Sequence, residues 1–288
     1  MYMLNIKDKV AIVGCSNAQL KTARPKIDKL LEVLESIGLQ PICSDYIYEK
    51  YSVFSGSGKE RADALMKFYL DDSIKAIFDI SGGNVANEVL EYLDFEIIKK
   101  NPKPFFGYSD LTTIINAIYS KTEIPSFLYQ IRNLIYDHGE EQIENFRKTI
   151  LEDKNDLLNI NYRFLQGNFI NGTVIGGNIR CFLKLAGTPY MPSFKDKVLF
   201  LESLGGEVPL MTTYLNQLKQ MGAFNEVKGI ILGTFTEMEE KQAKPTIEQL
   251  VLDIVNNKEI PIAKTEEIGH GSNSKAIVIG GEIKLQIS

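Results

Sequence analysis

Four short apolar runs in the N-terminal part of the chain predict buried strands. The run at 9–16 is rich in β-branched residues and ends in glycine and serine, which is typical of a parallel strand that leads into a loop. Similar runs follow at 39–44, 74–84 and 102–110, and the last two end in glycines and polar residues. Their length and their glycine and proline boundaries favour strands over helices.

Segments with helical spacing separate these runs. Apolar residues recur every three or four positions over 27–37, 61–70, 85–100 and 111–121. Strands that alternate with helices of about 10–15 residues imply right-handed crossovers and a parallel sheet. We therefore expect a doubly wound, mostly parallel α/β domain over residues 1–135.

The pattern changes after Pro125. Residues 138–160 form a polar, helix-like segment, so a linker is expected over 136–166. From near Gly167 the chain contains glycine-punctuated apolar runs with few long helical segments between them, which predicts a strand-rich domain over 167–288. The expected fold class is α/β, with an N-terminal doubly wound sheet and a C-terminal strand-rich domain.

Composition and charge exclude several classes of protein. The net charge is −5 and no basic cluster is present, which argues against nucleic-acid binding. No signal pattern and no apolar run of about 20 residues occurs, so neither secretion nor a membrane span is expected. Cys15, Cys43 and Cys181 lack paired spacing and predict reduced thiols in a cytoplasmic protein. His138 and His270 lack partners at ligand spacing, so no metal is expected.

Three polar loops, at 14–16, 81–84 and 107–110, follow predicted strands. Ligands of open α/β sheets bind at the carboxyl ends of the strands, so these loops are candidate site segments. In the second loop, backbone N–H groups of Gly82 and Gly83 could approach an oxyanion closely. A phosphate-binding loop is the alternative, although neither glycine-rich phosphate motif is present in this stretch.

Ser109 has two interpretations. The strand–turn–helix around it is similar to a nucleophile elbow, which presents a serine hydroxyl on a sharp turn. Leu111 stands where the second glycine of that motif belongs, so only half of the motif is present. The alternative is that Ser109 or Asp110 caps the helix that follows.

A catalytic serine needs a base and a carboxylate that orients the base. His138 lies in a charged segment and is expected at the surface. His270 stands between two glycines, which let the backbone approach a ligand closely, and an ordinary turn histidine is the alternative. Glu202 follows four apolar residues, so it is either a buried, partnered carboxylate or a strand-end charge facing water.

Six segments together resemble the L,D-carboxypeptidase family of serine peptidases, which includes the microcin-immunity hydrolases. They occur in order over nearly the whole chain: KAIFDISGGN…LEYLD, PFFGYSDLTTI, GTVIGGNIRCFLKLAGTPYMP, VLFLESLGGE, VKGIILGTF and IGHGSNSKAIVIGGEIKL. The resemblance implies a Ser–Glu–His triad at Ser109, Glu202 and His270, in a site between the domains. It also implies an oxyanion hole formed by the Gly83 backbone and the Asp110 N–H.

The resemblance implies a murein tetrapeptide substrate that loses its terminal D-alanine. Gly82, Asn84 and Arg180 are the expected substrate contacts, with Arg180 a candidate partner for the substrate's free carboxylate. No cofactor is expected. The expected partner is a small peptide or muropeptide, with no nucleic acid and no membrane, and the protein is expected to be a cytoplasmic homodimer.

Two features depart from the family pattern. The stretch IPSFLYQIRN, within the segment 124–135, lacks the Gly-Pro step that family members often carry, so the substrate-selecting loop is expected to differ. The chain has no tryptophan to stack on a base, although tyrosine and phenylalanine also stack. The alternatives are hydrolysis of an aminoacyl- or peptidyl-nucleotide amide, and a non-catalytic, two-lobed small-molecule binding protein.

Overall fold

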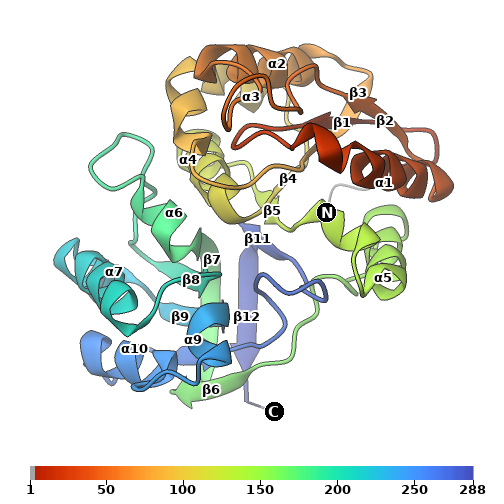
Figure 1. Ribbon diagram of the computed structural model, residues 1–288. Coiled ribbons are helices and arrows are strands. Elements are labelled where there is room, and N and C mark those ends of the chain that lie inside the picture. Colours follow the sequence, from red (N-terminus) through yellow and green to blue (C-terminus); the bar gives the residue numbers. More distant parts are fainter. Residues whose placement is uncertain (1–3, 288) are drawn as a thin grey trace.

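Two six-stranded sheets organise the computed structural model, which describes residues 4–287 (Figure 1). In spatial order the N-terminal sheet contains β11 (Ile277–Ile279), β5 (Ser126–Leu128), β4 (Phe105–Gly107), β3 (Ile74–Asp79), β1 (Lys9–Val13) and β2 (Gln40–Cys43). The C-terminal sheet contains β12 (Glu282–Gln286), β7 (Phe169–Asn178), β8 (Lys197–Ser203), β9 (Gly229–Phe235), β10 (Ile262–Lys264) and β6 (Arg163–Gln166). The edge strands β11, β12 and β6 run antiparallel to their neighbours, and the other pairs are parallel. The predicted two-domain α/β fold is confirmed.

Helices cover both faces of the N-terminal sheet, as a doubly wound fold requires. One face carries α1 (Arg24–Ser36) and α5 (Gly139–Leu151), and the other carries α2 (Gly58–Leu70), α3 (Phe95–Lys100) and α4 (Thr112–Thr122) (Figure 1). The pleat of β1 serves both layers, because Val10 and Ile12 pack with α1 while Ala11 and Val13 pack with α2. Short 3₁₀ turns lie in the connections: η1 (Lys21–Ala23), η2 (Ala86–Tyr92), η3 (Ser109–Leu111) and η4 (Ile131–Ile135).

The C-terminal sheet shares a core with the first domain. One of its faces, with Leu199 and Leu201 of β8, packs under its own helices. These are α6 (Ile179–Leu183), α7 (Val208–Gln220), α8 (Ala223–Glu226), α9 (Thr236–Glu240) and α10 (Ile247–Val255). On the opposite face, Phe200 belongs to the same cluster of buried residues as Ile114 of α4. The two sheets therefore meet through α4 rather than through a solvated linker.

Two local elements differ from the sequence predictions. The helix expected over 85–100 is split into η2 and α3, because Asp94 interrupts it and its carboxylate caps the new helix, accepting from Ile97 N at 3.0 Å. The strand β5 follows Pro125 and was not predicted, because three residues are too few to show a strand pattern.

Strand pairing also crosses the expected domain boundaries. The strand β6 and the helix α5 both lie in the segment 136–166 that was expected to be a linker. The strand pairs with β10 of the second sheet, and the helix packs on the first sheet through Phe146 and Ile150. Near the other end of the chain, β11 returns to the first sheet and pairs with β5. Periodicity within a segment does not show which sheet a strand joins.

Asn116 of α4 connects the two domains at a buried seam. Its side-chain amide donates to Gly176 O at 2.7 Å and accepts from Gly176 N at 2.9 Å, so it pairs both backbone groups of that β7 residue. On the same seam, Thr112 Oγ1 accepts from Asn178 N at 3.0 Å. Asn116 is fully buried, and a buried amide is stable only when its hydrogen bonds are made. These bonds fix α4, and the loop before it, against the second sheet.

Substitution of Asn116 by alanine should destabilise the protein by about 2–4 kcal/mol, because it leaves two buried backbone groups of Gly176 unpaired. Asn216 on α7 provides the matched control. Each of the two asparagines donates to the carbonyl oxygen four residues earlier at 2.8 Å, but among the described residues Asn216 has no partner across the domains. Asn216→Ala should therefore cost less than about 1 kcal/mol. Urea unfolding followed by circular dichroism measures the free energy of unfolding of both variants. Equal losses of stability would contradict the proposed role of Asn116 in joining the two domains.

Candidate active site

Ser109 lies on a sharp turn at the carboxyl end of β4. Its φ of 55° lies in the left-handed region, which residues other than glycine rarely adopt. The helix α4 begins after Leu111 without a side-chain cap. The interpretation of Ser109 or Asp110 as an N-cap is therefore wrong, and the strained turn is what an elbow that presents a side chain requires.

At the end of β8 the buried carboxylate of Glu202 pairs with the half-buried imidazole of His270. Glu202 Oε2 lies 2.7 Å from His270 Nδ1, and the other carboxylate oxygen accepts from Asn178 Nδ2 at 3.0 Å. Glu202 is fully buried, so the interpretation as a strand-end charge in water is wrong. The carboxylate is an acceptor, so it fixes the proton of the neutral imidazole on Nδ1 and leaves Nε2 as the free acceptor.

The surroundings of His270 keep the ring in place. His270 Nε2 is buried and has no hydrogen-bond partner among the described residues. The Tyr108 ring meets the imidazole edge to face, with 4.9 Å between centroids. Burial, and to a smaller extent the Glu202 charge, raises the pKa of the Tyr108 phenol well above its ordinary value. Tyr108 therefore packs against His270 as an uncharged side chain. The preceding residue must be glycine, because a Cβ on Gly269 would lie 1.6 Å from Thr234 Oγ1.

The loop after β3 lies beside Ser109. A Cβ added to Gly82 would be 3.9 Å from Ser109 Cβ. The next residue, Gly83, has a φ of 123°, and a side chain there would collide with Asn17, whose Cγ would be 2.3 Å from the added Cβ. Asn17 in turn accepts from Asn84 N at 2.9 Å and fixes the loop. The turn therefore needs glycine, and the assignment of Gly83 N–H as an oxyanion donor stays a prediction.

Two cations of the second domain, Arg180 on α6 and Lys184 directly after that helix, bind the loop that follows β3. Arg180 donates to Gly83 O at 2.8 Å and to Asn84 Oδ1 at 2.6 Å. Lys184 donates to Asn84 O at 2.8 Å and forms an ion pair with Asp110. In this arrangement Arg180 and Asn84 bind each other, and neither lines the cavity next to Ser109.

The carboxylate of Asp110 connects the segments around Ser109. It is fully buried, and its Oδ2 accepts from Ser16 Oγ at 2.6 Å and from Ala86 N at 2.9 Å. With the Lys184 ion pair, this single carboxylate joins the loop after β1, the start of η2 and the second domain. Its backbone N–H, the other expected oxyanion donor, belongs to the residue directly after Ser109 and likewise stays a prediction.

One cavity brings the candidate residues of both domains together. It has a volume of about 370 Å³, and its lining includes Ser109, Gly82 and Gly83 from the first domain and His270 from the second. Glu202 lies behind His270, out of the lining. Ser109 and His270 thus line the same cavity, and His270 contacts Glu202, which lies 68 residues before it in the chain. The assignment of the three as a triad stays a prediction.

Asn178 was not singled out from the sequence, although a signal for it was present. It ends the apolar run of β7 and lies in register with Glu202, at the end of the adjacent parallel strand. Polar residues at the carboxyl ends of neighbouring parallel strands meet at one edge of the sheet. The same argument that selected Glu202 could have found its hydrogen-bond partner.

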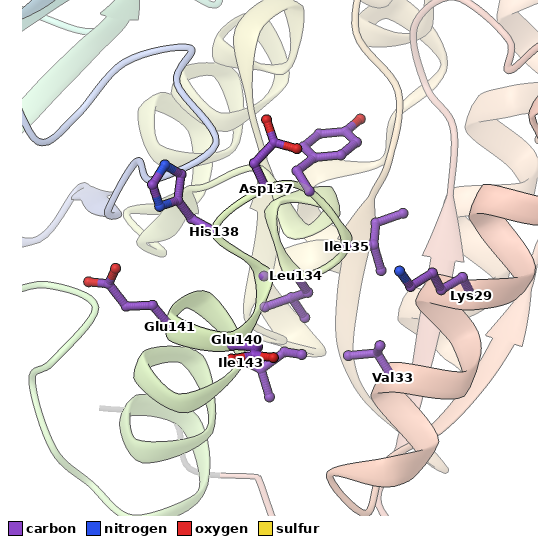
Figure 2. Close-up of a pocket in the computed structure, with 11 residues that line it drawn as sticks. Lys29, Val33, Leu134, Ile135, Asp137, His138, Glu140, Glu141 and Ile143 are labelled. Carbon is purple, nitrogen blue, oxygen red and sulfur yellow. The ribbon is translucent and has the colours of Figure 1, made fainter.

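His138 lies apart from this site. It is exposed and lines a second cavity of about 580 Å³, which also includes Lys29 and Val33 of α1 and Ile143 of α5. Figure 2 shows His138 and Lys29 on opposite sides of this hollow. The first cavity contains His270 and not His138, which agrees with the predicted surface position of His138.

No group of three or more His, Cys, Asp and Glu side chains within residues 4–287 is arranged to hold a metal ion. No helix in this range has the length and hydropathy to cross a membrane.

The fold and the cavity define a two-domain α/β protein with a serine from one domain and a carboxylate–histidine pair from the other. Comparison with families of known proteins agrees with this architecture. The model of the LD-carboxypeptidase N-terminal domain matches residues 10–129, and that of the LD-carboxypeptidase C-terminal domain matches residues 171–285. The chain belongs to the LD-carboxypeptidase family, a family of peptidases.

Two curated relatives align with nearly the whole chain. One is a Bacillus subtilis (strain 168) protein named "Probable murein peptide carboxypeptidase", 27% identical over 99% of this chain and 93% of the relative. The other is the microcin C7 self-immunity protein MccF of Escherichia coli, 25% identical over 99% of this chain and 91% of the relative.

Solved structures share the fold. An MccF-like protein from Bacillus anthracis (strain Ames) is 26% identical, with a TM-score of 0.87 over 100% of this chain and 95% of that chain. A structure of MccF in complex with glutamyl sulfamoyl guanosine has a TM-score of 0.86 at 21% identity, over 100% of this chain and 98% of that chain.

Proposed function

We propose that this protein is a serine-type L,D-carboxypeptidase that removes the terminal D-alanine of murein tetrapeptides. The observation that carries the proposal is the pair formed by the buried Glu202 carboxylate and His270, whose free imidazole nitrogen belongs to a residue lining the same cavity as Ser109. A binding protein has no need for a buried carboxylate that fixes a histidine tautomer beside a strained serine. The cytoplasmic location and the homodimer remain predictions from the sequence.

In the proposed reaction, Ser109 Oγ attacks the carbonyl carbon of the terminal amide. His270 Nε2 accepts the serine proton as the C–O bond forms, and then gives that proton to the leaving amine as the C–N bond breaks. Water repeats the sequence on the acyl-enzyme and releases the shortened peptide. Glu202 keeps the Nδ1 proton in place and stabilises the imidazolium formed at each step.

The oxyanion of each tetrahedral intermediate is proposed to bind the N–H groups of Gly83 and Asp110. Backbone donors that are already oriented stabilise developing charge without reorganisation. The contacts of Arg180 and Lys184 to this loop support the proposal, because they hold Gly83 in position from the second domain. These cations are then positioning residues that act through the loop.

A hydrolysis assay tests the proposed function. With a murein tetrapeptide as substrate, the protein should release D-alanine, measured by amino-acid analysis, and a serine-reactive phosphonate should label Ser109 and stop the reaction. EDTA should leave the rate unchanged. Activity that survives complete phosphonate labelling of Ser109, or that is lost with EDTA, would contradict the proposed mechanism.

The second candidate is hydrolysis of an aminoacyl- or peptidyl-nucleotide amide. It is favoured by the similarity to MccF and by Tyr136, an exposed aromatic residue in the lining of the cavity that could stack on a base. An aminoacyl sulfamoyl-adenylate, assayed beside the tetrapeptide, separates the two. We expect the tetrapeptide to be preferred by roughly tenfold or more in kcat/KM. The reverse preference would assign the second function, and binding of either compound without turnover would assign a non-catalytic binding protein.

A further inference from the structure

Arg132 is the cation of the cavity beside Ser109. It lies on η4, within the segment that departs from the family pattern, and it is half-buried. Among the described residues that line this cavity, it is the only lysine or arginine, and none is an aspartate or glutamate. The cavity that Ser109 lines therefore also presents a positive charge that no acidic residue of its described lining neutralises.

The guanidinium of Arg132 is oriented by neutral groups. Its Nη1 donates to Gln19 Oε1 at 3.2 Å, and its Nε donates to Gln130 Oε1 at 3.3 Å. Gln19 is itself held, since its Nε2 donates to Ile80 O at 3.0 Å, two residues before Gly82. Within residues 4–287, Nη2 of Arg132 makes no hydrogen bond and the side chain has no acidic partner. The guanidinium group of Arg132 is therefore held in place by neutral partners, and its positive charge remains free to pair with an anion.

The two cations that hold the loop beside Ser109 already have hydrogen-bond or ion-pair partners within the protein. Arg180 binds Gly83 O and Asn84, and Lys184 binds Asp110 and Asn84 O. Neither lines the cavity. An anionic group of a substrate in this cavity would therefore meet Arg132 and not Arg180.

We propose that Arg132 binds the free carboxylate of the residue that leaves, and so restricts cleavage to the carboxyl-terminal bond. This inference rests on the proposed function. A planar guanidinium donates two parallel hydrogen bonds to a carboxylate, which gives both affinity and geometry. Gln19 and Gln130 set the orientation of that fork, and Gln19 couples it to the strand that leads to Gly82–Gly83. The fixed position of Arg132 relative to Gly82–Gly83 then sets how far the bound substrate carboxylate lies from the amide bond that is cleaved.

The test uses two peptides that differ only at the C-terminus. One is the tetrapeptide with its free carboxylate, and the other carries a C-terminal carboxamide. The wild-type protein should prefer the free acid by about 10–100-fold in kcat/KM, which is the range for charge-assisted hydrogen bonds. In Arg132→Gln the acid-to-amide ratio should fall close to one, whereas Arg132→Lys should retain an intermediate ratio because it keeps the charge without the fork.

Arg24→Gln is the matched control, since Arg24 stands on α1 outside the cavity and should leave the ratio unchanged. Arg132→Met supplies a second neutral variant if Arg132→Gln does not fold. A folded neutral variant that keeps the wild-type ratio overturns the inference and leaves the proposed function intact. If the wild-type protein cleaves neither peptide, the proposed function fails and the inference fails with it.

Discussion

Ser109→Ala should lower turnover by about 10⁴–10⁶-fold, which is the loss expected when the nucleophile of a serine triad is removed. The protein should stay folded. Ser109 is half-buried on its turn, and no hydrogen bond of its hydroxyl is present in residues 4–287, so the change should alter the free energy of unfolding by less than about 1 kcal/mol. D-alanine release under saturating substrate and a melting curve measure the two effects.

The two histidines provide an internal control for this result. His270→Ala should be nearly as inactive as Ser109→Ala, since the two act as one unit. His138→Ala should stay within a few-fold of the wild type, because His138 lines the other cavity. Full activity of folded Ser109→Ala would show that the nucleophile is another residue. Loss of activity in His138→Ala but not in His270→Ala would assign the general base to His138.

Glu202→Gln should reduce turnover by about 10²–10⁴-fold, because an isosteric amide in place of a triad carboxylate can favour the wrong histidine tautomer. Asn178 donates to one carboxylate oxygen, so the remaining carbonyl of the glutamine would accept from Asn178 and its NH₂ would face His270 Nδ1. An N–H at that position needs an acceptor, which moves the ring proton to Nε2. The base would then have no free lone pair for Ser109.

Glu207→Gln is the control for the carboxylate. Glu207 is exposed and makes a surface ion pair with Lys241, with 2.7 Å between the charged atoms. Exposed pairs contribute about 0–1 kcal/mol, so activity and stability should hardly change. Initial rates at saturating substrate and melting curves compare the two variants. If Glu202→Gln keeps most of its activity while Glu207→Gln loses it, the carboxylate of the triad has been misassigned.

The sequence predicted the elements that make the site because burial leaves a local signature. Strands buried on both faces appear as continuous apolar runs, and the polar residues that follow them lie at the ligand-binding edge of a parallel sheet. Ser109 and Glu202 both stand directly after such runs. Neither required knowledge of the other for its selection, and the N-cap and solvent-exposed alternatives could not be dismissed until the φ of Ser109 and the burial of Glu202 were known.

Other features have no local signature. The pairing of β11 with β5, and of β6 with β10, joins segments more than 90 residues apart, so neither could be predicted from periodicity. The same limit affected the substrate contacts. Arg180 ends an apolar run that was expected to form a strand, whereas Arg132 follows β5, which was not predicted. Only the packed structure shows that Arg180 is bonded to the Gly83 loop and that Arg132 lines the cavity.

The sequence by itself therefore determined the fold class, the two domains and the identities of Ser109, Glu202 and His270 as candidates. These depend on hydrophobic periodicity and on residue type, which are properties of short segments. Only the tertiary structure shows the contact between His270 and Glu202 that the family resemblance implied, and the bonds by which Asn116 joins the domains. It also shows that Arg132 is the one lysine or arginine among the described residues that line the cavity. The reason is physical: contacts between distant segments follow from strand order and side-chain direction, and these are fixed only when the two cores pack together.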